Sequence, residues 1–140
     1  MADDKDKAWI EVQKKAFTHW VNTTLEARHK SITNSIEVDL ADGVLVIDFV
    51  ELLIGNTIKT KWTKAPSNRI NKIENSSIAL RFLKEHGVEE RMLTISAEEL
   101  VDGNLKLILG FCWMLFRKFR IMNMKGSEGS KLLFFLNFKL

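Results

Sequence analysis

Cysteine and proline are almost absent from this chain of 140 residues, which contains one of each, Cys112 and Pro66. A single cysteine excludes an internal disulfide framework and a cysteine-rich zinc site, and it favours a reducing, cytoplasmic setting. The three histidines, His19, His29 and His86, lie in different segments without the spacing of metal ligands. We therefore expect neither a metal nor another cofactor.

Long apolar runs are also missing. No window of 18 residues is uninterrupted by polar side chains, so no transmembrane segment is expected. The charged start MADDKDK does not resemble a secretory signal. A glycine-rich phosphate loop, a nucleophile elbow and a calcium-loop spacing are all lacking. Cys112 lies in an apolar helical stripe, where a thiol packs in the core instead of reacting. These absences indicate a protein that is not an enzyme.

The composition is that of one ordinary globular domain, with 46% hydrophobic and 28% charged residues. Its net charge of +3 is unevenly distributed, because residues 102–140 contain seven basic and two acidic side chains. A basic C-terminal third favours an acidic partner, which could be a protein filament, a nucleic acid or a membrane surface. Nucleic acid is the weakest of these candidates, since the basic residues are not interleaved with aromatic ones in a groove-sized patch.

Four helical patterns and no sustained strand alternation predict an all-α fold. The first helix should span roughly residues 7–28, with the wide apolar face of an amphipathic helix. A second helix is expected within residues 39–55, between a start at Asp42 and a stop at Gly55. The third should run from Ile70 to His86 and end at Gly87, after a loop over residues 57–69 that contains Trp62 and Pro66.

The last helical region begins with a capping box, in which Ser96 and Glu99 exchange side-chain hydrogen bonds with each other's backbone amides. Asp102 is then expected to cap a final helix that continues to Ile121. This helix is apolar nearly all round, so it should lie centrally or be covered by a partner.

The chain divides into three parts on composition. Residues 1–6 form a charged tail, residues 7–121 one helical domain, and residues 122–140 a linker followed by an apolar appendage. The apolar run 131–140 cannot fold alone. We expect it to pack back, to mediate self-association, or to be the start of a second domain.

Four segments, residues 7–25, 39–55, 73–88 and 95–113, resemble the calponin-homology family. The resemblance covers about residues 7–121 and is closest to the first domain in the tandem actin-binding regions of α-actinin, filamin and spectrin-type proteins. Its most specific motif is DGNLKLILG at residues 102–110. The resemblance implies a compact all-α calponin-homology domain with four main helices plus short ones. Trp20 and Trp113 are expected to anchor its core.

The resemblance also implies a partner, filamentous actin, whose surface is acidic, and therefore a cytoskeleton-associated, non-catalytic module. Positions on the first helix that match the family's filament-contacting surface are Lys14, Lys15, Thr18 and Asn22. Those on the last helix are Lys106, Leu107, Gly110 and Phe111. A basic supporting patch is expected from Lys59, Lys61, Lys64, Arg69 and Lys72.

A second class of function stays open. The sequence MLFRKFRIMNMK at residues 114–125 departs from the family pattern, because Arg117 and Lys118 interrupt an apolar stretch. A basic amphipathic segment of this kind is typical of targets of calmodulin-like proteins and of anionic membranes. The chain could then be a signalling adaptor that binds a regulatory protein and not actin.

Overall fold

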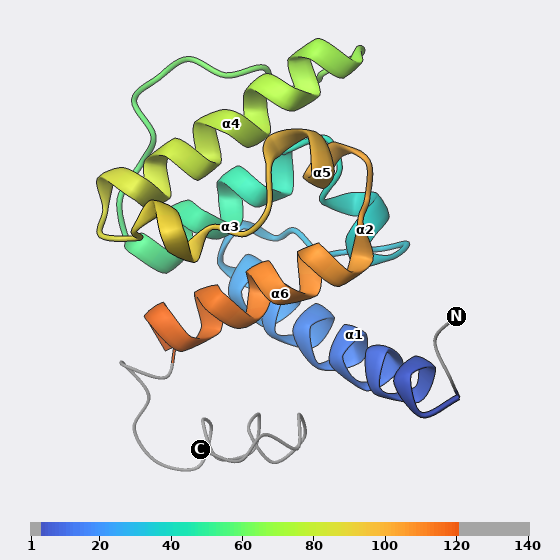
Figure 1. Cartoon of the computed structure of the whole chain (residues 1–140). Helices are drawn as coiled ribbons and strands as arrows, with labels where there is room; N and C mark the ends of the chain where they lie inside the picture. The colour runs from blue at the N-terminus through green and yellow to red at the C-terminus, as the bar shows by residue number, and fades with distance from the viewer. Residues whose placement is uncertain (1–3, 121–140) are drawn as a thin grey trace.

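The structure, a computed structural model, describes residues 4–120, and its regular elements are all helical. Its helices are α1 (Asp4–Leu25), α2 (Ile36–Asp39), α3 (Val44–Ile54), α4 (Arg69–Glu85), α5 (Ala97–Val101) and α6 (Leu105–Leu115). Three short helical turns follow α1, α4 and α6, at Glu26–Arg28, Glu90–Met92 and Phe116–Arg120. Within the described range there is no strand, and α1, α3, α4 and α6 are the four main helices (Figure 1). The predicted all-α fold is confirmed.

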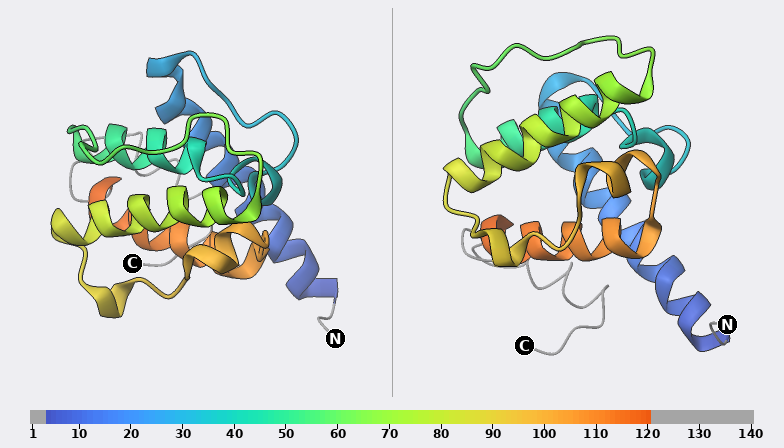
Figure 2. Two further views of the ribbon diagram at one scale, coloured as in Figure 1. Left: turned by 90° about the horizontal axis from the view of Figure 1, so that it is seen from above. Right: turned by 45° about the horizontal axis from the view of Figure 1, so that its top comes forward.

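The helices pack around α3 and α6. Helix α3 contacts α1 and α4, while α6 contacts α1, α2 and α5, and α5 also packs on α4. The N-terminal part of α1 projects beyond the other helices in every view (Figure 2). One helical bundle therefore leaves much of α1 and one side of α6 at the surface.

An aromatic cluster holds α1, α3 and the end of α6 together. Trp20 meets Phe49 and Phe116 edge to face, with ring centroids 5.0 and 5.3 Å apart. Each such pair contributes about 0.5–1.5 kcal/mol beyond the burial of apolar area. Trp20 is thus the expected core anchor. Trp113 is not, because it is only half-buried and stacks on Phe116 at the edge of the core.

The start and stop predicted for α3 are confirmed. The Asp42 side chain accepts a hydrogen bond from the Val44 amide at 2.9 Å, and Gly55 ends the helix with a left-handed φ of 79°. Gly43 precedes the helix with a φ of 80°, and a Cβ atom there would lie 2.6 Å from the Cβ of Asn75. Only glycine allows the chain to turn this close to α4.

The ends of the other helices confirm some predictions and correct others. Helix α4 begins after the Asn68 cap, and Gly87 follows it with a φ of 98°. The capping box is present, with hydrogen bonds of 3.1 and 2.9 Å between Ser96 and Glu99.

The boundaries of α1 and α6 differ from the sequence prediction. Asn104, and not Asp102, caps α6, since its side chain accepts from the Leu107 amide. Helix α1 begins at Asp4, within the expected tail, and ends at Leu25. The α-helical part of α6 ends at Leu115 and a π-helical turn continues to Arg120.

The expected linker and appendage, residues 122–140, lie outside the described residues, as do residues 121–125 of the basic amphipathic segment. Among residues 4–120, no helix combines the length and apolar character needed to cross a bilayer.

Candidate functional site

A shallow groove of about 380 Å³ lies between α1 and the segment that leads into α2. It is lined by Glu11, Lys14, Lys15, Thr18, His19, Asn22, Asn34 and Ser35. The structure thus brings together on one surface all four positions that the resemblance singles out on the first helix. We call this surface the α1 groove.

The four positions in the α1 groove are not equivalent. Lys15 is exposed and makes no ion pair with any residue of the described range. Lys14 is half-buried and pairs with Glu37 at 3.0 Å. The side-chain oxygen of Asn22 accepts from the Ile32 amide at 2.6 Å, so Asn22 fastens the chain that follows α1. Of the groove's lysines, Lys15 is therefore the one available to a partner.

Glu37 connects the α1 groove to the beginning of α6. Burial alone would raise the pKa of this carboxyl, but hydrogen bonds with Ser35 and Lys14 and the Lys14 charge hold its pKa below the ordinary value. The backbone of Glu37 lies so close to Gly103 that a Cβ atom on Gly103 would stand 3.2 Å from the Glu37 carbonyl oxygen. The groove and the N-terminus of α6 are therefore neighbours.

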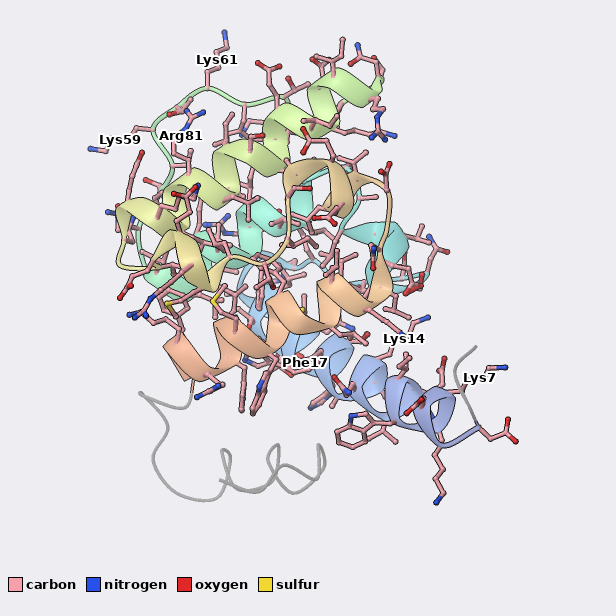
Figure 3. The ribbon with its side chains drawn as sticks, in the orientation of Figure 1. Lys7, Lys14, Phe17, Lys59, Lys61 and Arg81 are labelled. Carbon is pink, nitrogen blue, oxygen red and sulfur yellow. The ribbon has the colours of Figure 1, made fainter. Side chains whose placement is uncertain are left out.

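One side of α6 is exposed beside α1. Lys106, Gly110 and Arg117 are exposed and Trp113 is half-buried, and these residues recur at the spacing of one helical face. The Arg117 guanidinium lies 5.9 Å from the centre of the Trp113 ring. Trp113 also lies 6.5 Å, between ring centroids, from Phe17 of α1 (labelled in Figure 3). We call these four residues the α6 stripe, which the sequence analysis identified only at Lys106 and Gly110.

Phe111 does not belong to this surface, and its expected exposure is wrong. Its side chain is 2% exposed and lies in the buried stripe that also contains Ile108, Cys112 and Leu115. These residues recur at intervals of three and four, the period of a helix face directed into a core. Leu107 is half-buried and packs against the same core, so it offers only part of its side chain to a partner.

The five residues of the expected basic patch lie on the loop 55–68 and the first turn of α4. Lys59, Lys61 and Lys64 are exposed and Lys72 is half-buried. Lys59 and Arg81 line the same hollow, and both Lys59 and Lys61 lie far from Lys14 (Figure 3). The lysines of this loop therefore form a second cationic region, separate from the α1 groove.

Arg69 is exposed but already paired. Its guanidinium donates to Asp102 at the end of α5, and this hydrogen bond and charge lower the pKa of the Asp102 carboxyl. Asp102 thus joins α5 to α4 and does not cap α6. Because Asp102 already pairs with it, Arg69 is less available to a partner than the loop lysines are.

Within the described residues, neither the cysteine nor a group of metal ligands is suited to a reactive centre. Burial raises the pKa of the Cys112 thiol to about 12, so the thiol is protonated at neutral pH and unreactive. Within residues 4–120, no three side chains among histidine, cysteine, aspartate and glutamate are grouped so that they could hold a metal ion. The surfaces described above can bind by charge and shape.

Comparison with known proteins places the chain in a family. Residues 11–121 match the calponin homology (CH) domain. The chain is 44% identical to cortexillin-1 of Dictyostelium discoideum over 125 residues, which are 89% of this chain and 27% of the relative. It is 38% identical to alpha-actinin A of the same organism over 123 residues, 88% of this chain and 14% of the relative.

Filamin-A of Drosophila melanogaster is 38% identical over 128 residues, 91% of this chain and 6% of the relative. The chain thus spans less than a third of the length of each of these relatives. The resemblance to domains of α-actinin and filamin is confirmed. With the helical fold and a match that covers most of the sequence, the chain belongs to the calponin homology domain family.

Proposed function

We propose that this chain is an actin-filament-binding module of a cytoskeletal protein, which acts by surface complementarity and without catalysis or a cofactor. The observation that carries the proposal is the adjacency of the α1 groove and the α6 stripe, joined through Glu37 and through the Phe17–Trp113 contact. These are the two helices that the resemblance to the family singles out for filament contact. A cytoplasmic, cytoskeleton-associated location follows from this partner.

The residues take different roles in the proposed interface. Lys15 and Lys106 supply charge to an acidic filament, because both are exposed and neither forms an ion pair within the described range. Thr18 and Leu107 offer partly exposed contacts, and Gly110 keeps the α6 stripe flat. Asn22, Phe111 and Lys14 support the interface. Lys59, Lys61 and Lys64 form the second cationic region, and Arg69 and Lys72 follow it in the first turn of α4.

Where the regulatory protein is calmodulin-like, the signalling-adaptor alternative requires it to take up residues 114–125. Leu115 and Phe116, within that segment, are fully buried in the core. Capture of the segment would have to remove both from the core, and loss of one large core side chain costs about 2–5 kcal/mol. This cost favours the filament over the adaptor role.

Co-sedimentation with actin filaments at two salt concentrations tests the proposal. Saturable binding that weakens as salt rises is expected, since exposed charge pairs are screened. Titration with calmodulin in calcium is run beside it. A folded, monomeric protein that fails to pellet with filaments but shifts on calcium–calmodulin would replace the filament proposal by the adaptor.

A further inference from the structure

The loop 55–68, which carries Lys59, Lys61 and Lys64, is fastened at two points by buried side chains. The first point is Glu51 of α3, which is 7% exposed. One of its carboxylate oxygens accepts from the Ile58 amide at 2.6 Å, and the other accepts from Arg28 at 2.7 Å. A carboxylate that accepts a backbone N–H fixes that part of the loop more strongly than a neutral acceptor does.

The second point is Asn75 of α4, whose side chain is fully buried. Its amide oxygen accepts from the Thr63 N–H at 3.0 Å, and its amide nitrogen donates to the Thr63 carbonyl at 2.8 Å and to the Asp42 carbonyl at 3.2 Å. Thr63 is thus held on both of its backbone groups by one side chain. The close approach of Gly43 to Asn75 keeps the Asp42 turn within reach of the same amide.

Between the two points, the loop directs apolar side chains inward and lysines outward. Ile58 and Trp62 are partly buried against the core, whereas Lys59 and Lys61 are exposed. The ammonium group of Lys64 lies 4.4 Å from the centre of the Trp62 ring, a cation–π contact. The three lysines are therefore displayed from a backbone whose position is fixed.

The charges beneath the loop are balanced. Asp48 and Glu51 are both buried carboxylates of α3, and unpaired they would offset part of the lysine charge above them. Arg28 donates to both carboxylates at 2.7 Å, and Lys30 donates to Asp48 at 2.6 Å. The loop lysines consequently keep their charge for an external partner.

We propose that Glu51 and Asn75 are positioning residues for filament binding, which hold Lys59, Lys61 and Lys64 as a preorganised array against the acidic filament surface. The inference rests on the proposed function. Its physical basis is entropic, because a loop that is ordered before binding does not lose that freedom on binding. Neither Glu51 nor Asn75 needs to touch the filament.

The test compares Asn75→Ala with Ser76→Ala. Ser76 is the matched control, since it is equally buried on the same helix and its hydroxyl has no hydrogen-bond partner. Filament affinity should fall about three- to tenfold in Asn75→Ala and stay within about twofold of wild type in Ser76→Ala. Amide hydrogen exchange at Thr63 should become faster only in Asn75→Ala. Circular dichroism at the assay temperature verifies that each variant is folded.

Glu51→Gln provides a second route if Asn75→Ala does not fold. In Glu51→Gln the single side-chain oxygen replaces two carboxylate oxygens, so it cannot reproduce both the hydrogen bond from Arg28 and that from the Ile58 amide. Its control is Asp48→Asn, which can keep only one of the contacts with Arg28 and Lys30 and has no bond to the loop. Filament affinity should fall about threefold or more in Glu51→Gln relative to Asp48→Asn.

The decisive comparison adds Lys59→Ala/Lys61→Ala/Lys64→Ala. If Asn75 acts through these lysines, adding Asn75→Ala to the triple variant lowers filament affinity little beyond the loss that the triple variant already shows. An equal loss in both backgrounds overturns the inference, and so does wild-type affinity in Asn75→Ala or Glu51→Gln. If the wild-type protein itself does not bind filaments, that result overturns the proposed function, and with it the inference about Glu51 and Asn75.

Discussion

The ammonium group of Lys14 on α1 lies 3.0 Å from a carboxylate oxygen of Glu37 on α2. This ion pair is partly buried at both ends, and it divides two lysines that are adjacent in the sequence. Lys14 is committed to holding α2 against α1, while Lys15 is exposed in the same groove. Positions of the same residue type in a binding surface can therefore differ in role.

Alanine substitutions should separate the two lysines. Lys14→Ala should lower the free energy of unfolding by up to about 1 kcal/mol, because a partly exposed ion pair is lost. Lys15→Ala should leave stability unchanged within about 0.5 kcal/mol and weaken filament binding more than Lys14→Ala does. Urea unfolding and co-sedimentation measure the two effects. Stronger loss of binding in a fully stable Lys14→Ala would reverse the assignment.

Phe111→Ala should behave as a core substitution. The side chain is 2% exposed, and removal of a buried phenylalanine costs about 3–5 kcal/mol. Leu107→Ala should cost less, since Leu107 is half-buried. Thermal and urea unfolding of both variants provide the comparison. If Phe111→Ala has wild-type stability but binds filaments weakly, Phe111 belongs to the interface and not to the core.

Gly110→Glu should keep the fold and weaken filament binding about tenfold or more, because it adds a bulky negative charge to the α6 stripe. A Cβ atom at Gly110 meets no atom within 4 Å, so the fold has room for a side chain there. Thr94→Glu, at an exposed position before α5, is the control with the same added charge. Equal filament affinity for the two variants would exclude the α6 stripe from the interface.

Lowering the pH should destabilise the segment before α2, because it protonates the carboxyl of Asp39. Burial would raise the pKa of its carboxyl, but hydrogen bonds from the Asn34 and Thr33 amides outweigh burial and lower the pKa below the ordinary 3.8. A lowered folded-state pKa stabilises the protein above the unfolded-state value, and this stability is lost as the pH falls through the folded-state value.

The measurement is urea unfolding at about pH 6 and about pH 3. Asp39→Asn should be less stable than wild type at the higher pH, and the difference should narrow at the lower pH. A constant difference between the two proteins would show that the Asp39 charge is not the cause.

Local sequence patterns were enough to predict most of the helices. The Ser96–Glu99 capping box, the Asp42 start and the glycines at 55 and 87 act within a few residues, so their roles can be read from the chain. The α1 positions also fell on one surface, because helical spacing alone brings them together. These helix starts and ends, and the residues that share one helix face, depend on short-range geometry, so the sequence was enough to predict them.

Relationships between distant segments were not predictable. Asp102 could cap α6 or pair with another element, and its actual partner, Arg69, lies 33 residues away. The choice between Phe111 and Trp113 as the buried aromatic required the rotation of α6 against α1, which an almost uniformly apolar helix does not specify. The hydrogen bonds between the Asn75 side chain and the Thr63 backbone join a helix to a loop, and no sequence motif predicts them.

The most direct test of filament binding through the α1 groove and the α6 stripe is co-sedimentation of the double variant Lys15→Ala/Lys106→Ala at low salt. The control is Lys84→Ala, an exposed lysine of α4 that pairs with Glu90. The double variant should remain folded and lose about tenfold in filament affinity, while the control binds like wild type. Wild-type affinity in the folded double variant would contradict the proposed interface.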